Sequence, residues 1–412
     1  MERDDKMKTV YLDNNATTSI KPEVIDAMMP YLTDIWGNAS SVFYEVGQKA
    51  ETELLKLRES VAKNIGAKNA NEVYFTASGC EADNWAIKGY AFANKRKGNH
   101  IITTKIEHHA ILGACEFLEK HGFRVTYLDV DEYGIVSPER VEAAITDETI
   151  LISVMTANNE IGAIEPIKEI AQVAKNHKVA FHTDAVQAIG HMEIDVCDLG
   201  VDMLSISAHK FHGPKGVGML YIKNGTRIDN LIHGGGQERG KRAATENLAG
   251  IAGLAKALDM AVSNLDKNIE HMKAMRDRLI KGLKERIDYI KLNGPDDERR
   301  LCNNVNFSYE FVEGEAILMR LNMKGICASS GSACASGSLD PSHVLLAIGV
   351  PHEIAHGSIR FSVSEDTTEE EIDYVIEEMP KIIEKLRAMS PMFEAFEDGK
   401  LTSFTKKYME DR

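Results

Sequence analysis

Several features that mark secreted, metal-binding or membrane-spanning chains are scarce in this sequence. The 412 residues include only six cysteines, which are spread along the chain and form no Cys-x-x-Cys pair. This spacing argues against a disulfide framework and against a closed zinc site. No run of about 18 apolar residues occurs, and the first residues are hydrophilic where a secretory signal needs an apolar stretch. We therefore expect a cytoplasmic protein without membrane contact.

Basic residues are fewer than acidic ones. Lys and Arg number 48 against 63 Asp and Glu, which gives a formal net charge of −15. No block of Lys and Arg offsets this charge locally, so nucleic acid is not an expected partner. The content of 43% hydrophobic and 27% charged residues is typical of a globular protein, and the length is sufficient for two cores.

Short apolar runs alternate with amphipathic stretches between Val73 and about Ile222. The runs include HIITT, RVTYLDV, ILISVM, VAFHTD and MLSIS, and IKEIAQVAKNH is one of the amphipathic stretches. This order predicts βα units and a mainly parallel sheet. Because ligands of such sheets gather where the strands end, the polar residues directly after each run are the candidates for function.

The pattern changes after the three glycines at 234–236. Helical periodicity covers Leu248 to Arg286, and a strand, CNNVNFSYE, and a helix, EGEAILMRLNM, follow it. The last predicted helix begins with Thr368-x-x-Glu371, which is typical of a capping box. We expect a second domain of α+β type in this part of the chain, followed by a polar terminal arm.

Lys210 lies where a predicted strand ends. The strand MLSIS runs into Ala208-His209-Lys210, and a Gly/Pro turn then leads back into VGMLYI. A lysine at such a position can form a Schiff base with an aldehyde cofactor when its amine is desolvated or close to other cations. A solvated lysine in a turn is the simpler interpretation, because a single lysine is a weak motif.

Asp184 closes the preceding strand, VAFHTD, and Gln187 follows one short turn later. Pyridoxal phosphate (PLP) needs a carboxylate at its ring nitrogen to keep that nitrogen protonated, so that the ring can withdraw electrons from the substrate. Asp184 is placed for this role, although an Asp at a strand-to-helix turn is often a helix N-cap. The two interpretations can be decided only jointly with that of Lys210.

Cys334 lies in SSGSACASGS, residues 329–338, a run of small residues that cannot form a core and that we expect to be mobile. A cysteine on a mobile loop can bring its thiolate to a reaction partner, which a buried structural cysteine cannot do. Most lone cysteines are instead inert and small. Cys327 is assigned to packing, and a Cys327–Cys334 disulfide is a minor expectation in a reducing cytoplasm.

Ten segments of the chain form an ordered set of motifs. They are YLDNNATT, GNASS, SGCEADN, IEHHAIL, TANNEIG, HTDAVQ, SAHKFHGPKG, GGGQERG, SSGSACASGSLDPSHVL and AHGSIRFS. Together they resemble the motifs of cysteine desulfurases of the NifS/IscS type, which are fold-type I PLP enzymes of aminotransferase class V. The matches run from about Val10 to Glu371.

The resemblance implies an α/β fold, with a large domain built on a mainly parallel seven-stranded sheet flanked by helices and a smaller α+β domain. It also implies the PLP-dependent removal of sulfur from L-cysteine, which gives L-alanine and a persulfide on Cys334. The predicted large domain is 16–254, and the small domain consists of 1–15 and 255–412, which include the cysteine loop and the C-terminal arm.

Individual roles also follow from the resemblance. Lys210 would hold the cofactor and move the substrate Cα proton, Asp184 would pair with the ring nitrogen, and Gln187 would hydrogen-bond the ring hydroxyl. His108 would stack on the ring and take part in catalysis, where the alternatives are a metal ligand or a surface residue. The phosphate would be bound by Gly79, Cys80, Ser207 and His209, with Thr245 reaching over from the partner subunit of a homodimer.

Asn158 and Arg360 would bind the substrate carboxylate, and Asn158 would also contact the cofactor. An Arg fork suits a carboxylate because it offers two parallel donors, but a structural salt bridge is the alternative for Arg360. No protein-bound metal is expected, although Cys334 could contact a nascent iron–sulfur cluster. The C-terminal MSPMFEAFEDGKL resembles the tail that docks iron–sulfur scaffold proteins of the IscU/NifU type.

Some positions depart from the family pattern. Cys80 stands where threonine is usual, Ala39 where proline is usual and Phe43 where histidine is frequent, and Val363-Ser364-Glu365 replaces the more common Leu-Gly-Arg. A selenocysteine lyase or a class V aminotransferase would share Lys210 and Asp184, and a catalytically idle sulfur-trafficking partner is a third alternative. The sequence does not indicate which pathway receives the sulfur.

Overall fold

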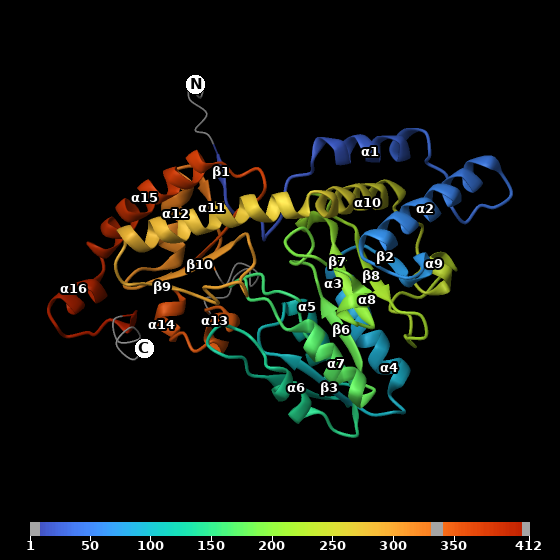
Figure 1. The fold of residues 1–412 in the computed structure, drawn as a ribbon, viewed down its shortest axis with the longest axis horizontal. Coiled ribbons are helices and arrows are strands. Elements are labelled where there is room, and N and C mark those ends of the chain that lie inside the picture. Colours follow the sequence, from blue (N-terminus) through green and yellow to red (C-terminus); the bar gives the residue numbers. More distant parts are fainter. Residues whose placement is uncertain (1–8, 331–340, 406–412) are drawn as a thin grey trace.

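The computed structural model describes residues 9–330 and 341–405 of the chain. Figure 1 shows two lobes, a larger one around a seven-stranded sheet and a smaller one around β10 (Asn304–Tyr309). The helices α10 (Leu248–Ser263) and α11 (Leu265–Arg286) lead from the larger lobe to the smaller one.

The large sheet has the strand order β2-β8-β7-β6-β5-β3-β4. β8 runs antiparallel to both of its neighbours, and the other strands share one direction. The predicted mainly parallel sheet of seven strands is therefore confirmed. Its strands are β2 (Val73–Thr76), β3 (His100–Thr104), β4 (Arg124–Leu128), β5 (Thr149–Ser153), β6 (Ala180–Asp184), β7 (Met203–Ser207) and β8 (Gly218–Ile222).

Helices cover both faces of this sheet. Successive residues of a strand point to opposite faces, so neighbouring apolar residues of one strand pack against different helices. Leu151 packs with residues of α3, α4 and α5 on one face, whereas Ile152 packs with residues of α2, α7 and α10 on the other. The helices of this lobe, besides α10, are α1 (Pro22–Thr33), α2 (Glu45–Asn64), α3 (Gly79–Asn84), which continues through the π-turn Trp85–Gly89 into α4 (Tyr90–Asn94), α5 (His109–Glu119), α6 (Pro138–Ala144), α7 (Ile167–His177), α8 (Val196–Leu199) and α9 (Gln237–Gly240).

The smaller lobe combines the start of the chain with its last third. β1 (Val10–Tyr11) pairs in parallel with β11 (Ile326–Cys327), and β10 lies between β9 (Ile290–Leu292) and β12 (Ser358–Ser362), antiparallel to both. The core of this lobe consists of side chains from β1, β10, α11, α12 and α15. The remaining helices are α12 (Gly314–Met323), α13 (His343–Ala347), α14 (His352–Ala355), α15 (Glu369–Arg387) and α16 (Pro391–Glu397).

The predicted elements of this second part are largely confirmed, including the capping box, in which Thr368 and Glu371 bond each other's backbone at the start of α15. The helical periodicity from Leu248 to Arg286 is divided, however, between α10 and α11, which meet at 75°. The predicted boundary between 254 and 255 lies inside α10, so the limits of the two domains stay a prediction.

In the part of the chain that the structure describes, no single helix is long and apolar enough to cross a membrane. The bent pair of α10 and α11 meets the criterion only when both helices are counted together.

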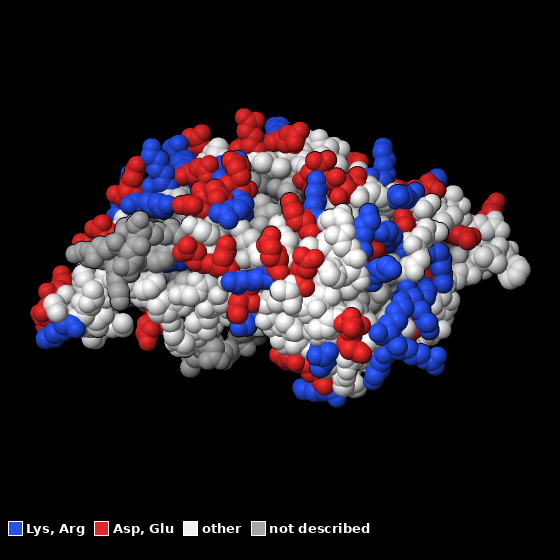
Figure 2. Space-filling model, turned by 60° about the horizontal axis from the view of Figure 1, so that its bottom comes forward, with Lys and Arg blue, Asp and Glu red and all other residues white. Residues whose placement is uncertain are grey.

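Charge is distributed unevenly over the surface. Figure 2 shows Lys and Arg side chains gathered on one side of the face in view, while acidic and basic side chains are mixed over the rest. One groove of the large lobe, about 440 Å³ in volume, is lined by five cations from three segments: Lys97, Lys175, Lys178, Lys223 and Arg227. Because the three segments are far apart in the sequence, no block of Lys and Arg in the sequence indicates this groove.

Candidate active site

Lys210 follows β7 directly, on a single 3₁₀ turn, Ala208–Lys210. Its Nζ donates hydrogen bonds to the carbonyl oxygens of Asn15, at 2.5 Å, and Ala16, at 2.9 Å. The segment that follows β1 therefore folds across the end of the large sheet and meets the lysine there. The side chain is half-buried, which does not fit a freely solvated lysine in a turn.

Asp184 ends β6, and its side chain is buried, with 6% of its surface exposed. Its Oδ1 accepts a hydrogen bond from the Val186 N–H at 2.9 Å, so it closes a turn and does not cap a helix. Burial raises the pKa of Asp184 to about 6, although that turn bond and the charge of Lys210 lower it. A cation placed against this carboxylate would therefore be strongly favoured.

Gln187 reaches the same carbonyl as Lys210. Its Nε2 donates to the Asn15 oxygen at 2.9 Å, while its Oε1 is buried and has no hydrogen-bond partner among the described residues. A buried amide oxygen without a donor is costly, so this atom calls for one. The hydroxyl of a bound pyridoxal ring would supply such a donor.

The helix that begins with α3 starts at Gly79, directly after the turn that follows β2. Ser78 is its N-cap and accepts from the Glu81 N–H. A Cβ on Gly79 would lie 2.8 Å from a methyl group of Val186 and 3.2 Å from the Cβ of Ser207, so only glycine lets the helix approach the sheet this closely. The start of this helix and Ser207 thus share one corner, which is suited to an anion.

His108, predicted to stack on the ring, and His209, predicted to bind the phosphate, are neutral imidazoles. His108 is the N-cap of α5, where its Nδ1 accepts from the Ala110 N–H at 3.1 Å, and so its Nε2 carries the proton. Burial, followed by the charge of Lys210, lowers the pKa of each to about 4. The Nδ1 of His209 lies 3.2 Å from the hydroxyl oxygen of Thr17.

Arg360, on β12, is buried against the N-terminal segment. Its Nη2 forms a salt bridge of 2.9 Å with Oδ1 of Asp13, and its Nη1 donates to the Asn159 carbonyl at 3.0 Å. Only Nε remains without a partner within the described chain. The structural salt bridge considered from the sequence is thus present, and Nε is the donor left for a substrate.

Asn158 is completely buried and shapes the turn after β5. Its Oδ1 accepts from the Glu160 and Ile161 N–H groups, and its Nδ2 faces the Ile106 carbonyl at 2.9 Å and the Met155 sulfur at 3.5 Å. The predicted contact of Asn158 with a substrate carboxylate would require one of these bonds to be exchanged.

One predicted site residue lies away from the cluster, and another is outside the described part of the chain. Thr245 lies exposed in the segment between α9 and α10. Cys334 falls in 331–340, outside the described residues. The flanking residues are fixed at the site: the backbone of Ser329 pairs with that of Arg360, and the Ser342 hydroxyl donates to a carboxylate oxygen of Glu160 at 2.5 Å.

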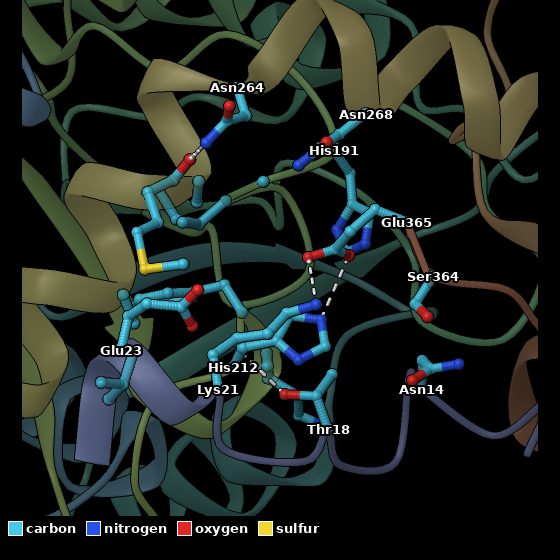
Figure 3. Close-up of a pocket in the computed structure, with 18 of the residues that line it drawn as sticks. Asn14, Thr18, Lys21, Glu23, His191, His212, Asn264, Asn268, Ser364 and Glu365 are labelled. Atoms are coloured by element: carbon cyan, nitrogen blue, oxygen red, sulfur yellow. Dashed lines mark hydrogen bonds and ion pairs between the residues drawn. The ribbon is translucent and has the colours of Figure 1, made fainter. Parts of the chain in front are cut away.

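A cavity of about 210 Å³ adjoins Lys210 between the two lobes (Figure 3). Glu365 reaches into it from the segment after β12 and lies 3.1 Å from Nε2 of His212 and 3.2 Å from Nζ of Lys21. Although burial raises the pKa of Glu365, these two partners bring it down to about 2. The departure from the family pattern at this position thus creates an ion pair with Lys21 and a hydrogen bond with His212 between the lobes.

Sequence reasoning missed several buried groups behind this cluster. They are Asn15, Asp83, Glu107 and His182, together with the half-buried Asp13. A signal for His182 existed, because it precedes Asp184 by two residues on one strand and therefore points to the same face of the sheet. The others come from segments that only the fold brings together.

Comparison with known proteins places this cluster in a family. The aminotransferase class V model matches residues 10–375. The chain belongs to the aminotransferase class V family. Its relatives within the family include cysteine desulfurase IscS of Clostridium botulinum (strain Hall), 61% identical over 95% of this chain and 99% of that relative, and cysteine desulfurase IscS of Methanosarcina thermophila, 55% identical over 93% and 94%.

Solved structures of family members agree with the fold. A NifS-like protein superposes with a TM-score of 0.86 at 39% identity, covering 92% of this chain and all of that structure. SspA in complex with cysteine superposes with a TM-score of 0.76 at 35% identity, covering 87% of this chain and 99% of that one. The chain is thus a fold-type I member of the class V family over nearly its whole length.

Proposed function

We propose that this chain is a PLP-dependent cysteine desulfurase that converts L-cysteine to L-alanine and retains the sulfur as a persulfide on Cys334. The observation that carries the proposal is the convergence of Lys210 and Gln187 on the Asn15 carbonyl beside Asp184. The desulfurase relatives, at up to 61% identity, supply the substrate class. The reaction balances without an oxidant: cysteine and a thiol give alanine and a persulfide.

The residues present fit PLP. Gln187 offers the ring hydroxyl an unpaired acceptor, Asp184 offers the ring nitrogen a buried carboxylate, and the helix start at Gly79 with Ser207 offers the phosphate an anion site. Lys210 would hold the cofactor covalently. When bound, PLP withdraws electrons from the substrate carbon and so acidifies its Cα–H bond.

The chain's own residues then handle the protons and the carboxylate. The Lys210 amine takes the Cα proton and returns a proton to the product. His108, neutral and fixed by Ala110, covers the ring without adding a charge. Arg360 has its fork oriented by Asp13 and the Asn159 carbonyl and presents Nε to the substrate. The thiolate of Cys334 attacks the substrate sulfur.

A direct assay tests this function. The purified protein, incubated with PLP and L-cysteine, should release alanine, and mass spectrometry should locate an added sulfur atom on Cys334. An aminotransferase would release a keto acid in place of alanine, and a selenocysteine lyase would act on selenocysteine but not on cysteine. A protein that binds no PLP would contradict the proposal and favour an idle trafficking partner.

A homodimer is part of the proposal, and the described surface supports it. α1 and the segment leading to α2 extend from the large lobe (Figure 1) and leave large apolar side chains in solvent. Their exposed fractions are 96% for Phe43, 70% for Trp36 and 61% for Leu32. Apolar side chains gathered on one arm mark an interface, and a second copy would cover them and bring its Thr245 to the phosphate.

Mixed dimers test this arrangement. Thr245→Ala should weaken PLP binding about tenfold, because one hydrogen bond to a charged group is lost. A dimer of one Thr245→Ala chain and one Lys210→Ala chain should regain one site of wild-type affinity, since its intact lysine is paired with the intact threonine of the other chain. Equal affinity of the mixed and the Thr245→Ala dimers, or a monomer in sedimentation, would contradict the shared site.

We also propose that the C-terminal arm binds an iron–sulfur scaffold protein of the IscU/NifU type. The Glu310 carboxylate anchors the arm by accepting from the Phe404 N–H at 3.0 Å and the Thr405 N–H at 2.6 Å. In the arm, the exposed fractions are 59% for Met389, 40% for Met392 and 40% for Leu401. These side chains line an apolar groove of about 660 Å³. The groove runs between α14, α16 and the turn before α12.

A single charge should disrupt this contact. Met392→Asp should weaken scaffold binding at least about tenfold, as the loss of an apolar anchor does, and should leave alanine formation unchanged. Phe117→Asp, also at an exposed apolar residue but on α5, is the matched control and should bind normally. If deletion of all residues after Met389 left binding in a pull-down unchanged, the scaffold would dock elsewhere.

The cytoplasm is the proposed compartment. It is supported by the free state of the five cysteines among the described residues: Cys80, Cys115, Cys197, Cys302 and Cys327.

A further inference from the structure

A row of buried polar side chains crosses the centre of the large sheet, on the face that α3 covers. Oγ of Ser153 on β5 lies 2.9 Å from Nδ1 of His182 on β6, and Nε2 of His182 lies 3.0 Å from Oγ of Ser205 on β7. All three residues are completely buried. Ser205 is the register partner of Asp184, so the row ends beside the carboxylate assigned to the ring nitrogen.

Asp83, on α3, lies over this row and is 1% exposed. Ser205 lies beside its carboxyl group, and its Oδ1 is 3.8 Å from Nε2 of His182. That oxygen has no hydrogen-bond partner, and no Lys or Arg of the described chain lies within ion-pair distance of it. An acid buried in this way would be expensive if its only purpose were packing.

The hydrogen bonds of the row can be ordered. Burial lowers the pKa of His182 to about 3, so its imidazole is neutral and carries one proton. When the Ser205 hydroxyl donates to an ionised Asp83, the oxygen of Ser205 accepts from Nε2 of His182, and Nδ1 of His182 accepts from Ser153. Every donor in the row then points toward Asp83, which polarises the row to favour negative charge there.

We propose that Asp83 is a positioning residue for Asp184, holding a second negative charge behind it when a protonated ring nitrogen is bound. This inference rests on the proposed function. A second carboxylate strengthens the hold of the site on the ring proton, because that proton then faces two negative charges and not one. The row supplies the hydrogen bonds that let Asp83 ionise inside the core.

The other titratable groups around Asp184 are consistent with this role. Without a cation at Asp184 the carboxyl groups oppose each other's ionisation: burial, then the charge of Asp184, raises the pKa of Asp83, and burial raises that of Glu107 to about 8. A bound pyridinium relieves that repulsion. The titratable groups that interact with Asp184 are Cys80 and Asp83 on α3, Glu107 before α5 and Lys210 after β7, and His182 precedes it by two residues on β6.

The test is a pH titration of the visible absorption band of bound PLP in the full-length protein. Asp83→Asn removes the negative charge but keeps the shape, so the midpoint should fall by about one pH unit, the lower end of what a neighbouring charge does to a buried group. Ser205→Ala keeps all charges but removes the donor that stabilises ionised Asp83, so it should shift the midpoint in the same direction by a smaller amount.

Glu165→Gln is the matched control. Glu165 is also a buried carboxyl, but its Oε2 accepts from the Val136 N–H away from the row. The midpoint of the PLP band in Glu165→Gln should therefore equal that of the wild type. Unchanged midpoints in both Asp83→Asn and Ser205→Ala would overturn the inference alone. If Asp83→Asn fails to fold, the Ser205→Ala midpoint decides. A wild-type protein without the band would overturn the proposed function, and the inference with it.

Discussion

Lys210→Ala should abolish the yellow colour of the PLP-loaded protein and reduce alanine formation to below about a thousandth of the wild-type rate. The variant loses both the covalent anchor of the cofactor and the base that moves the Cα proton. It should still fold, because the Lys210 amine lies at the edge of the sheet, where it bonds the backbone carbonyls of Asn15 and Ala16. Absorption near the visible band and product analysis by chromatography measure the two effects.

Lys215→Ala is the matched control for this variant. Lys215 is exposed in the same turn, five residues further on, and should be replaceable without loss of colour or activity. A small primary amine added to Lys210→Ala should restore part of the proton transfer, since the vacated space lies beside Asp184. If Lys210→Ala stayed yellow and active, another amine would hold the cofactor and the assignment would be wrong.

The parts of the site that follow a strand were predictable from the sequence. Apolar alternation located the ends of β6 and β7, and Asp184, Ser207 and Lys210 lie at those ends in the structure. The prediction worked because parallel strands end at one edge of the sheet, whatever the rest of the chain does. The same reasoning identified Gln187, whose unpaired oxygen is visible only in three dimensions.

Contacts between distant segments were not predictable. Asp13 and Arg360 are separated by 347 positions and form a salt bridge, and Asn15 receives hydrogen bonds from residues more than 170 positions away. No local periodicity encodes such pairs. The bend between α10 and α11 was missed for a related reason: Asn264 breaks the helix, but the helical spacing of apolar residues continues across it.

The position of Asp83 could not be predicted from its motif. The resemblance assigns the first two helical residues of its segment, SGCEADN, to phosphate binding, and the fifth, Asp83, faces the sheet beside Asp184. A helix that binds an anion at its start buries another side chain one turn later, because 3.6 residues make a turn. One short helix can therefore serve both ends of a cofactor, its phosphate and its ring nitrogen.

Cys334→Ser should abolish the persulfide and lower alanine formation from cysteine by at least about a hundredfold, since serine is a far weaker nucleophile toward sulfur. The visible band should persist, and cysteine should still perturb it, because Lys210 and Asp184 are untouched. The loss would therefore lie in sulfur transfer and not in cofactor binding. Stopped-flow absorption follows the cofactor band, and mass spectrometry detects the persulfide.

The other cysteines provide the controls, because the nucleophile must be a thiolate at neutral pH. Burial raises the pKa of Cys115 and of Cys302 to about 12, and burial, then the charge of Asp13, raises that of Cys327. Cys327→Ser and Cys80→Ser should accordingly keep the persulfide on Cys334. Cys80 stands at the proposed phosphate site in place of the usual threonine. A persulfide found on Cys80 would contradict the assignment of Cys334 and would place the sulfur acceptor at that phosphate site.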